Sequence, residues 1–126
     1  MVQTDISQIC AEAADWRQIL RNYRDEFADC KKSLQEMCRR TLSKDQLRDI
    51  EHFDNQFHIQ LINIHDVKQE IKNHEKKIRG DLSTSDQVTE QTVTEHEKLL
   101  DEFLTLENTL QELRNDFRKF INNTSC

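Results

Sequence analysis

Metal coordination is the chemistry to which the histidines, cysteines and carboxylates of this chain are best suited. Asp54 and His58 follow Glu51 at three and seven residues, so all three share one face of a helix. Cys30, on a preceding helix, lies within reach of Asp54 and His58 if the two helices pack antiparallel. Cys30, Asp54 and His58 therefore form one loosely defined candidate site for a single metal ion. The competing interpretation is a set of solvated or hydrogen-bonded polar residues beside an apolar seam.

Other kinds of catalytic or cofactor site lack their sequence signatures. No pair of the four cysteines has the Cys-x-x-Cys spacing of zinc or redox motifs. The Glu-x-x-His step that di-iron bundles repeat is absent. A single glycine excludes the Gly-rich phosphate loops, and no nucleophile elbow or Ser-His-Asp order appears. We therefore expect a protein that is not an enzyme and carries no cofactor.

Composition favours continuous helix. The 126 residues include no proline and one glycine, and 33% are charged. Apolar residues recur at alternating steps of three and four over residues 5–40, as in a heptad repeat. This seam comprises Ile6, Ile9, Ala13, Trp16, Leu20, Tyr23, Phe27, Cys30, Leu34 and Met37. The spacing predicts a first helix over about 5–40.

Capping signals divide the rest of the chain into two further helices. Residues 43–46 read Ser-Lys-Asp-Gln, a capping box that starts a helix over about 44–79. Gly80 is expected to close that helix as its C′ residue, with a loop over 81–85. A third helix follows over about 85–122. One bent helix of about 75 residues in place of the first two is the alternative.

These helices predict an all-α fold: an elongated antiparallel three-helix bundle, up-down-up, with coiled-coil-like heptad packing in one domain of residues 1–126. The expected architecture is similar to spectrin-type three-helix repeats, and the likeness is one of architecture only. A helical hairpin completed in a dimer is the rival fold. In the bundle, Phe57 is expected to face Phe27.

Polar residues interrupt the predicted seam. Lys68 is expected to face Trp16 on one side and Glu95 or His96 on the other. A charge at such a position costs stability unless it is paired or reaches solvent. We therefore expect Lys68 to pair with Glu95 and to lay its methylene stem on the ring of Trp16.

Several apolar residues fall outside the three seams, which predicts an interface. A helix that is apolar around most of its circumference needs more neighbours than two, and exposed apolar surface commonly marks a contact site. We expect a helical scaffold or protein-interaction module. It self-associates, most simply as a dimer, or binds a helical partner through the middle of the second helix. The candidate residues are Phe53, Ile59, Ile62, Val67, Leu100 and Leu104.

The charge of the chain is uneven, and this limits its partners. Residues 81–126 carry ten acidic and four basic side chains, which account for the whole net charge of −6. This acidic face disfavours nucleic acid and makes a basic partner, bound on the third helix, an alternative. No apolar stretch is long enough to span a membrane. Charged residues also interrupt any signal-peptide-like segment near Met1, so a cytoplasmic protein is expected.

Overall fold

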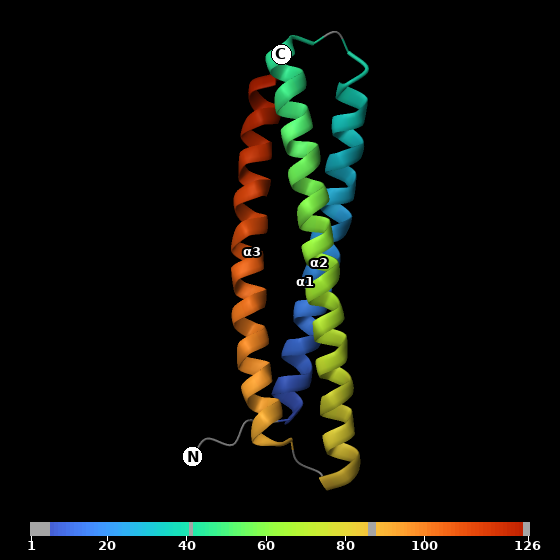
Figure 1. Cartoon of the computed structure of the whole chain (residues 1–126), viewed down its shortest axis with the longest axis vertical. Coiled ribbons are helices and arrows are strands. Elements are labelled where there is room, and N and C mark those ends of the chain that lie inside the picture. The colour runs from blue at the N-terminus through green and yellow to red at the C-terminus, as the bar shows by residue number, and fades with distance from the viewer. Residues whose placement is uncertain (1–5, 41, 86–87, 125–126) are drawn as a thin grey trace.

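The computed structural model describes residues 6–40, 42–85 and 88–124, and these ranges form three helices and no strand. The helices are α1 (Ile6–Met37), α2 (Lys44–Ser85) and α3 (Glu90–Thr124). They lie side by side along one long axis, and successive helices run in opposite directions (Figure 1). The predicted all-α, elongated antiparallel three-helix bundle is confirmed.

The core is an apolar column along the bundle axis. In α1, the predicted seam supplies the buried residues Ile9, Ala13, Trp16, Leu20, Tyr23, Phe27 and Leu34. In α3, the buried apolar residues are Leu99, Phe103, Leu106, Leu110, Leu113 and Phe117. Each large apolar side chain stabilises the fold by roughly 1.5–3 kcal/mol when fully buried, so the seams supply most of the driving force.

An aromatic layer joins all three helices. The rings of Phe27 in α1 and Phe57 in α2 meet edge to face with their centroids 4.9 Å apart, as the sequence predicts. Phe117 of α3 packs edge-on against Phe57 at 5.0 Å and against Phe53 at 5.4 Å. Each edge-to-face pair adds roughly 0.5–1.5 kcal/mol to the stabilisation that comes from burying its area. This layer therefore contributes strongly to the stability of the core.

The first helix connection follows the predicted capping box. The Ser43 hydroxyl accepts the backbone N–H of Gln46 at 3.1 Å, and the Gln46 side-chain oxygen accepts the backbone N–H of Ser43 at 2.9 Å. The alternative of one bent helix is therefore wrong. The first helix ends at Met37 rather than near residue 40, and the chain turns through Cys38, Arg39 and Arg40 before the restart.

The second connection differs from the prediction. The helix does not close at Gly80: α2 continues to Ser85, so the predicted loop over 81–85 is helical. A helix tolerates an internal glycine at a cost of about 1 kcal/mol, which other contacts can offset. Here Asp81 accepts hydrogen bonds from the Thr89 backbone N–H (3.3 Å) and the Thr92 hydroxyl (2.6 Å). The first turn of α3 therefore binds the extended end of α2.

Thr89, and not a residue of 83–85, caps α3. Its hydroxyl accepts the backbone N–H of Thr92 at 3.2 Å, and α3 begins at Glu90. Because α2 is longer and α3 starts later than predicted, the residues that face each other differ. His74 rather than Lys68 meets His96, a displacement close to one heptad. His74 lies six residues from Lys68 and so on a neighbouring face of α2, which the predicted seam does not include.

The buried face of α2 is also wider than predicted, because this helix packs against both α1 and α3. A second stripe of residues, seven apart, is buried or half-buried in addition to the seam: Phe53, Gln60, Val67 and His74. Leu47, assigned to the seam from the sequence, is instead 40% exposed.

Candidate functional site

A chain of three hydrogen-bonded side chains, one from each helix, crosses the bundle core. Nε2 of His74 in α2 lies 2.8 Å from Nδ1 of His96 in α3. Nε2 of His96 lies 2.8 Å from Oε2 of Glu12 in α1. Both histidines are only 6% exposed. The two buried histidines and the half-buried Glu12 therefore form a polar relay that ties the helices together.

The acceptor at one end fixes the tautomers of both rings. A carboxylate only accepts, so Nε2 of His96 carries the proton that Glu12 receives, and its Nδ1 is an acceptor. Nε2 of His74 then donates to that Nδ1, which leaves Nδ1 of His74 without a proton. This last nitrogen is buried and has no hydrogen-bond partner among the described residues. The relay thus ends at Nδ1 of His74, an unprotonated nitrogen without a described hydrogen-bond partner.

The electrostatics of the relay follow from its burial and its hydrogen bonds. Burial lowers the pKa of His74, and the neighbouring His96 lowers it further, because both disfavour a positive charge on the ring. The hydrogen bond from His96 holds the pKa of Glu12 below its usual range. The relay is therefore an anionic Glu12 joined to a neutral His74.

The indole of Trp16 forms one wall of the relay. It stacks on His96 with ring centroids 4.6 Å apart and on Phe103 at 5.8 Å. The ring of His74 also stacks on His96, with centroids 5.0 Å apart. The predicted polar layer thus brings Trp16 and His96 together, but with Glu12 and His74 as their partners.

The predicted pairing of Lys68 with Glu95 is wrong. Glu95 instead accepts a hydrogen bond from Lys77 at 2.7 Å, in keeping with the displaced register. Lys68 is buried, and its pKa is lowered by that burial and by the nearby cations Arg24 and Arg21. Lys68 therefore lies among like charges of α1 and not in the layer of Trp16.

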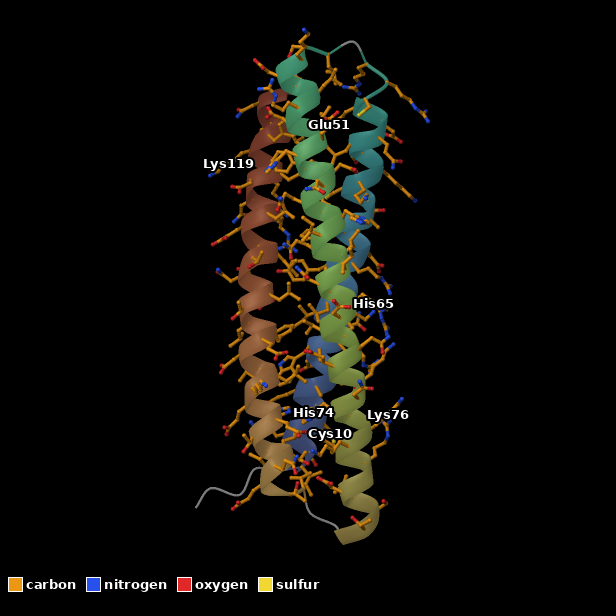
Figure 2. The ribbon with its side chains drawn as sticks, in the orientation of Figure 1. Cys10, Glu51, His65, His74, Lys76 and Lys119 are labelled. Atoms are coloured by element: carbon orange, nitrogen blue, oxygen red, sulfur yellow. The ribbon has the colours of Figure 1, made fainter. Side chains whose placement is uncertain are left out.

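Two ion pairs flank the relay and reinforce the same layer. The guanidinium of Arg17 in α1 donates to both carboxylate oxygens of Glu75 in α2, at 3.0 and 3.3 Å. Lys77 and Glu95 join α2 to α3 at the rim. His74, labelled in Figure 2, lies in the half of the bundle that contains the start of α1.

A hollow between α2 and α3 opens next to the relay. It has a volume of about 310 Å³, and His74, Glu70 and Glu102 are among its lining residues. A hydrogen bond with Glu102 is the largest effect that raises the pKa of Glu70, to about 7. Glu70 therefore keeps its proton to a higher pH than a free carboxyl group does, although its side chain is exposed.

The predicted metal candidate does not assemble. Cys30 is half-buried in a hollow between α1 and α3, beside Arg114 and Phe117, and burial raises the pKa of its thiol to about 11. Asp54 lies 3.7 Å from Lys31, and His58 is exposed. Within residues 6–40, 42–85 and 88–124, no three His, Cys, Asp or Glu side chains are placed to hold a metal ion.

The predicted interface residues separate into three groups. Phe53 is in the aromatic core, so its assignment to an exposed interface is wrong. Val67 and Leu100 are half-buried and pack against the core. The remaining three are exposed on two helices: Ile59 (40%) and Ile62 (49%) on α2, and Leu104 (50%) on α3.

Sequence reasoning missed two members of the relay, Glu12 and His74. The signal for His74 is the second heptad stripe of α2, in which it follows Phe53 at a multiple of seven residues. Glu12 directly precedes the seam residue Ala13. A glutamate at such a position is common on solvent-exposed helix surfaces, so no sequence signal distinguishes it.

Comparison of the chain with protein-family models, with curated proteins and with solved structures gave no match. Among the described residues, no helix combines the length and the apolar character needed to cross a bilayer.

Proposed function

We propose that the protein is a non-enzymatic helical scaffold that self-associates through the outer face of α2. The observation that carries this proposal is a charge-free surface in a highly charged chain. Residues 55–65 contain no Asp, Glu, Lys or Arg, whereas these types make up 33% of the sequence. Two isoleucines of this span, Ile59 and Ile62, expose 40% and 49% of their surface.

The composition of this face is that of an interface centre. Charged residues are depleted at the centres of protein interfaces, and exposed apolar residues there gain from burial. Asn55, His58 and His65 are exposed in the same span and supply neutral polar groups. The face lies along α2 between Glu51 and Lys76, both marked in Figure 2.

A second copy of the same chain fits this face. In a two-fold, antiparallel contact with Ile62 on the axis, residues equally far from Ile62 meet each other. His58 then lies opposite Asp66 of the partner subunit, and Asn55 lies opposite Gln69 of the partner subunit. The like-charge pairs of this arrangement all lie outside the neutral span 55–65: Asp54 with Glu70, Asp49 with Glu75, and Arg48 with Lys76. This self-complementarity favours a copy of the chain over a partner of strong charge.

The absence of an enzymatic role is part of the proposal. His74 and His96 are held in place by hydrogen bonds, as the general base of an enzyme is. Both rings, however, are buried. A general base must reach the proton that it abstracts. A cytoplasmic location is also proposed, since Cys10, Cys30 and Cys38 are free thiols, as a reducing compartment maintains them.

The test is light scattering over a concentration series, with one disruptive and one matched variant. Ile62→Glu places two like charges on the two-fold axis, so we expect it to weaken the dimer by at least about a hundredfold. Leu104→Glu introduces the same charge at a similarly exposed leucine on α3 and leaves the dimer unchanged. Circular dichroism checks that both variants keep their helices. A wild-type chain that stays monomeric at high concentration, or dissociation by Leu104→Glu instead, contradicts the proposal.

A further inference from the structure

A groove runs between α2 and α3 on a different face from the one proposed for self-association. Three hollows form it in line, and neighbouring hollows share lining residues: Glu70, Lys98 and Glu102 at one junction, Gln60 and Thr109 at the other. The central hollow is the largest of the three, at about 600 Å³. We call this continuous channel the α2/α3 groove.

The groove has the length and the floor of a helix-binding site. Its lining residues on α2 extend from His52 to Lys77, which corresponds to roughly 37 Å of helix. Apolar side chains recur along its floor: the half-buried Val67, and Leu99, Leu106 and Leu113, which expose 6–8% of their surface there. An amphipathic helix of a partner binds such a surface through residues at three- and four-residue spacing.

The walls of the groove are strongly acidic. Two lysines line it, Lys77 and Lys98. Seven carboxylates line it, two on α2 (Asp66, Glu70) and five on α3 (Glu95, Asp101, Glu102, Glu112, Asp116). Most of the net charge of −6 is thus concentrated along one channel. A ligand with cationic flanks complements this charge.

Two further features indicate that groups in the groove lack partners. Glu70 lies close enough to Glu102 for a side-chain hydrogen bond and for repulsion of like charge, and both raise the pKa of Glu70. His74 lines the same hollow and carries the buried nitrogen that has no described partner. A cation beside Glu70 and Glu102 would remove their mutual repulsion.

We propose that the α2/α3 groove binds a basic amphipathic helix of another protein as the fourth helix of the bundle. The apolar stripe of that helix packs on the floor, and its Lys and Arg side chains reach the carboxylates on both walls. This gives the basic partner expected from the acidic third helix a defined place, bounded by two helices. The groove differs from the dimer contact proposed above, which is centred on Ile62, although Asp66 lies at the edge of both.

The probe is a synthetic peptide of about 24 residues, which spans roughly 36 Å as a helix, with leucine at heptad positions a and d and lysine beside them. Binding is measured by fluorescence anisotropy of the labelled peptide at several salt concentrations. We expect saturable binding of one peptide per chain that weakens steeply with salt. A peptide with glutamate in place of lysine, and one of the same composition in scrambled order, are expected not to bind. Equal binding of the scrambled peptide overturns the proposal.

Paired variants separate the groove from general attraction to an acidic protein. Glu70→Gln with Glu102→Gln removes two neighbouring carboxyl groups inside the groove and is expected to weaken binding about tenfold. Glu90→Gln with Glu97→Gln removes two charges from exposed positions of α3 that do not line the groove, with less than about a twofold effect. Equal losses in the two pairs would show that net charge alone binds the peptide.

A steric variant tests the same site without changing charge. Thr105 is exposed and lines the central hollow, so Thr105→Trp fills the groove and is expected to weaken peptide binding about tenfold. Thr94→Trp, at an exposed position of α3 outside the groove, serves as its control. Light scattering on the Glu70→Gln, Glu102→Gln variant identifies the other possible occupant. If that variant loses self-association, a second copy of the chain fills the groove and the proposal is wrong.

Discussion

Nε2 of His74 lies 2.8 Å from Nδ1 of His96, so a single hydrogen bond between two buried rings joins α2 to α3. The same His96 ring donates to Glu12, which adds α1 to the connection. The bundle therefore has a layer in which polar side chains from all three helices are hydrogen-bonded to one another, beside the stacked ring of Trp16.

Removal of His96 is expected to destabilise the bundle more than removal of both histidines. His96→Leu leaves the buried Nε2–H of His74 without an acceptor, which costs roughly 1–3 kcal/mol. With His74→Leu added, no buried donor remains unpaired, so part of that stability returns. Urea unfolding followed by circular dichroism measures both variants. A double variant that is less stable than His96→Leu alone would contradict this account of the relay.

The stability of the fold is expected to decrease as the pH drops through 6.5, which is the ordinary pKa of histidine. Because the pKa of His74 is lowered in the folded state, the unfolded chain binds the proton more readily, and acid favours unfolding. The surrounding charges do not reverse this direction; they are Glu75, Lys77, Glu95 and His96. Thermal unfolding between pH 8 and pH 5 tests this, and His74→Leu should flatten the profile in that window.

Glu70 is expected to act in the opposite direction. Its pKa is raised from 4.5 to about 7 in the folded state, so the folded chain holds a proton that the unfolded chain loses. The stability that this group contributes is fully present below pH 4.5 and is lost as the pH rises through 7. Glu70→Gln should therefore raise the midpoint of thermal unfolding at pH 8 and change it less at pH 5. Glu97→Gln, at an exposed position of α3, is the control and should show no such difference.

Gly80→Ala is expected to stabilise the protein. Gly80 lies inside α2, and a Cβ atom added there meets no other atom within 4 Å. Alanine is favoured over glycine in a helix interior by about 1 kcal/mol. Denaturant unfolding measures the gain. A loss of stability would instead support the helix end that the sequence predicts at this residue, where a left-handed backbone would exclude alanine.

Ser43→Ala is expected to cost about 1 kcal/mol, because it removes the side-chain oxygen that caps the first turn of α2. Ser33→Ala provides the matched control. Ser33 is exposed within α1, where alanine is at least as favourable as serine. Chemical denaturation compares the two variants, and an equal effect at both positions would exclude a special role for the cap.

The fold was predictable where a local pattern decides the structure. Heptad spacing determines which face of α1 and α3 is buried, and the Ser43 capping box needs only four adjacent residues. The second connection was not predictable in this way. Gly80 carries the local signature of a helix end, but contacts of Asp81 with residues on α3 favour continuation. Long-range contacts therefore outweighed a weak local preference.

The same limit explains what could be predicted of the site. Trp16 and His96 were recognised because both lie on apolar seams. Their partners depend on the register between helices and on the second buried stripe of α2, which together place His74 rather than Lys68 against His96. Periodicity identifies a face, whereas the end of the preceding helix determines which residue on that face meets a neighbour.

An odd number of antiparallel helices has a mechanical consequence. The first helix begins at one end of the bundle and the third finishes at the other (Figure 1). Segments joined at these two points are held apart by the length of a helix, roughly 50 Å. Tension between them acts parallel to every helix axis, so it loads the interhelical contacts in shear, all at the same time. The arrangement is that of a stiff spacer that resists stretching along its whole length.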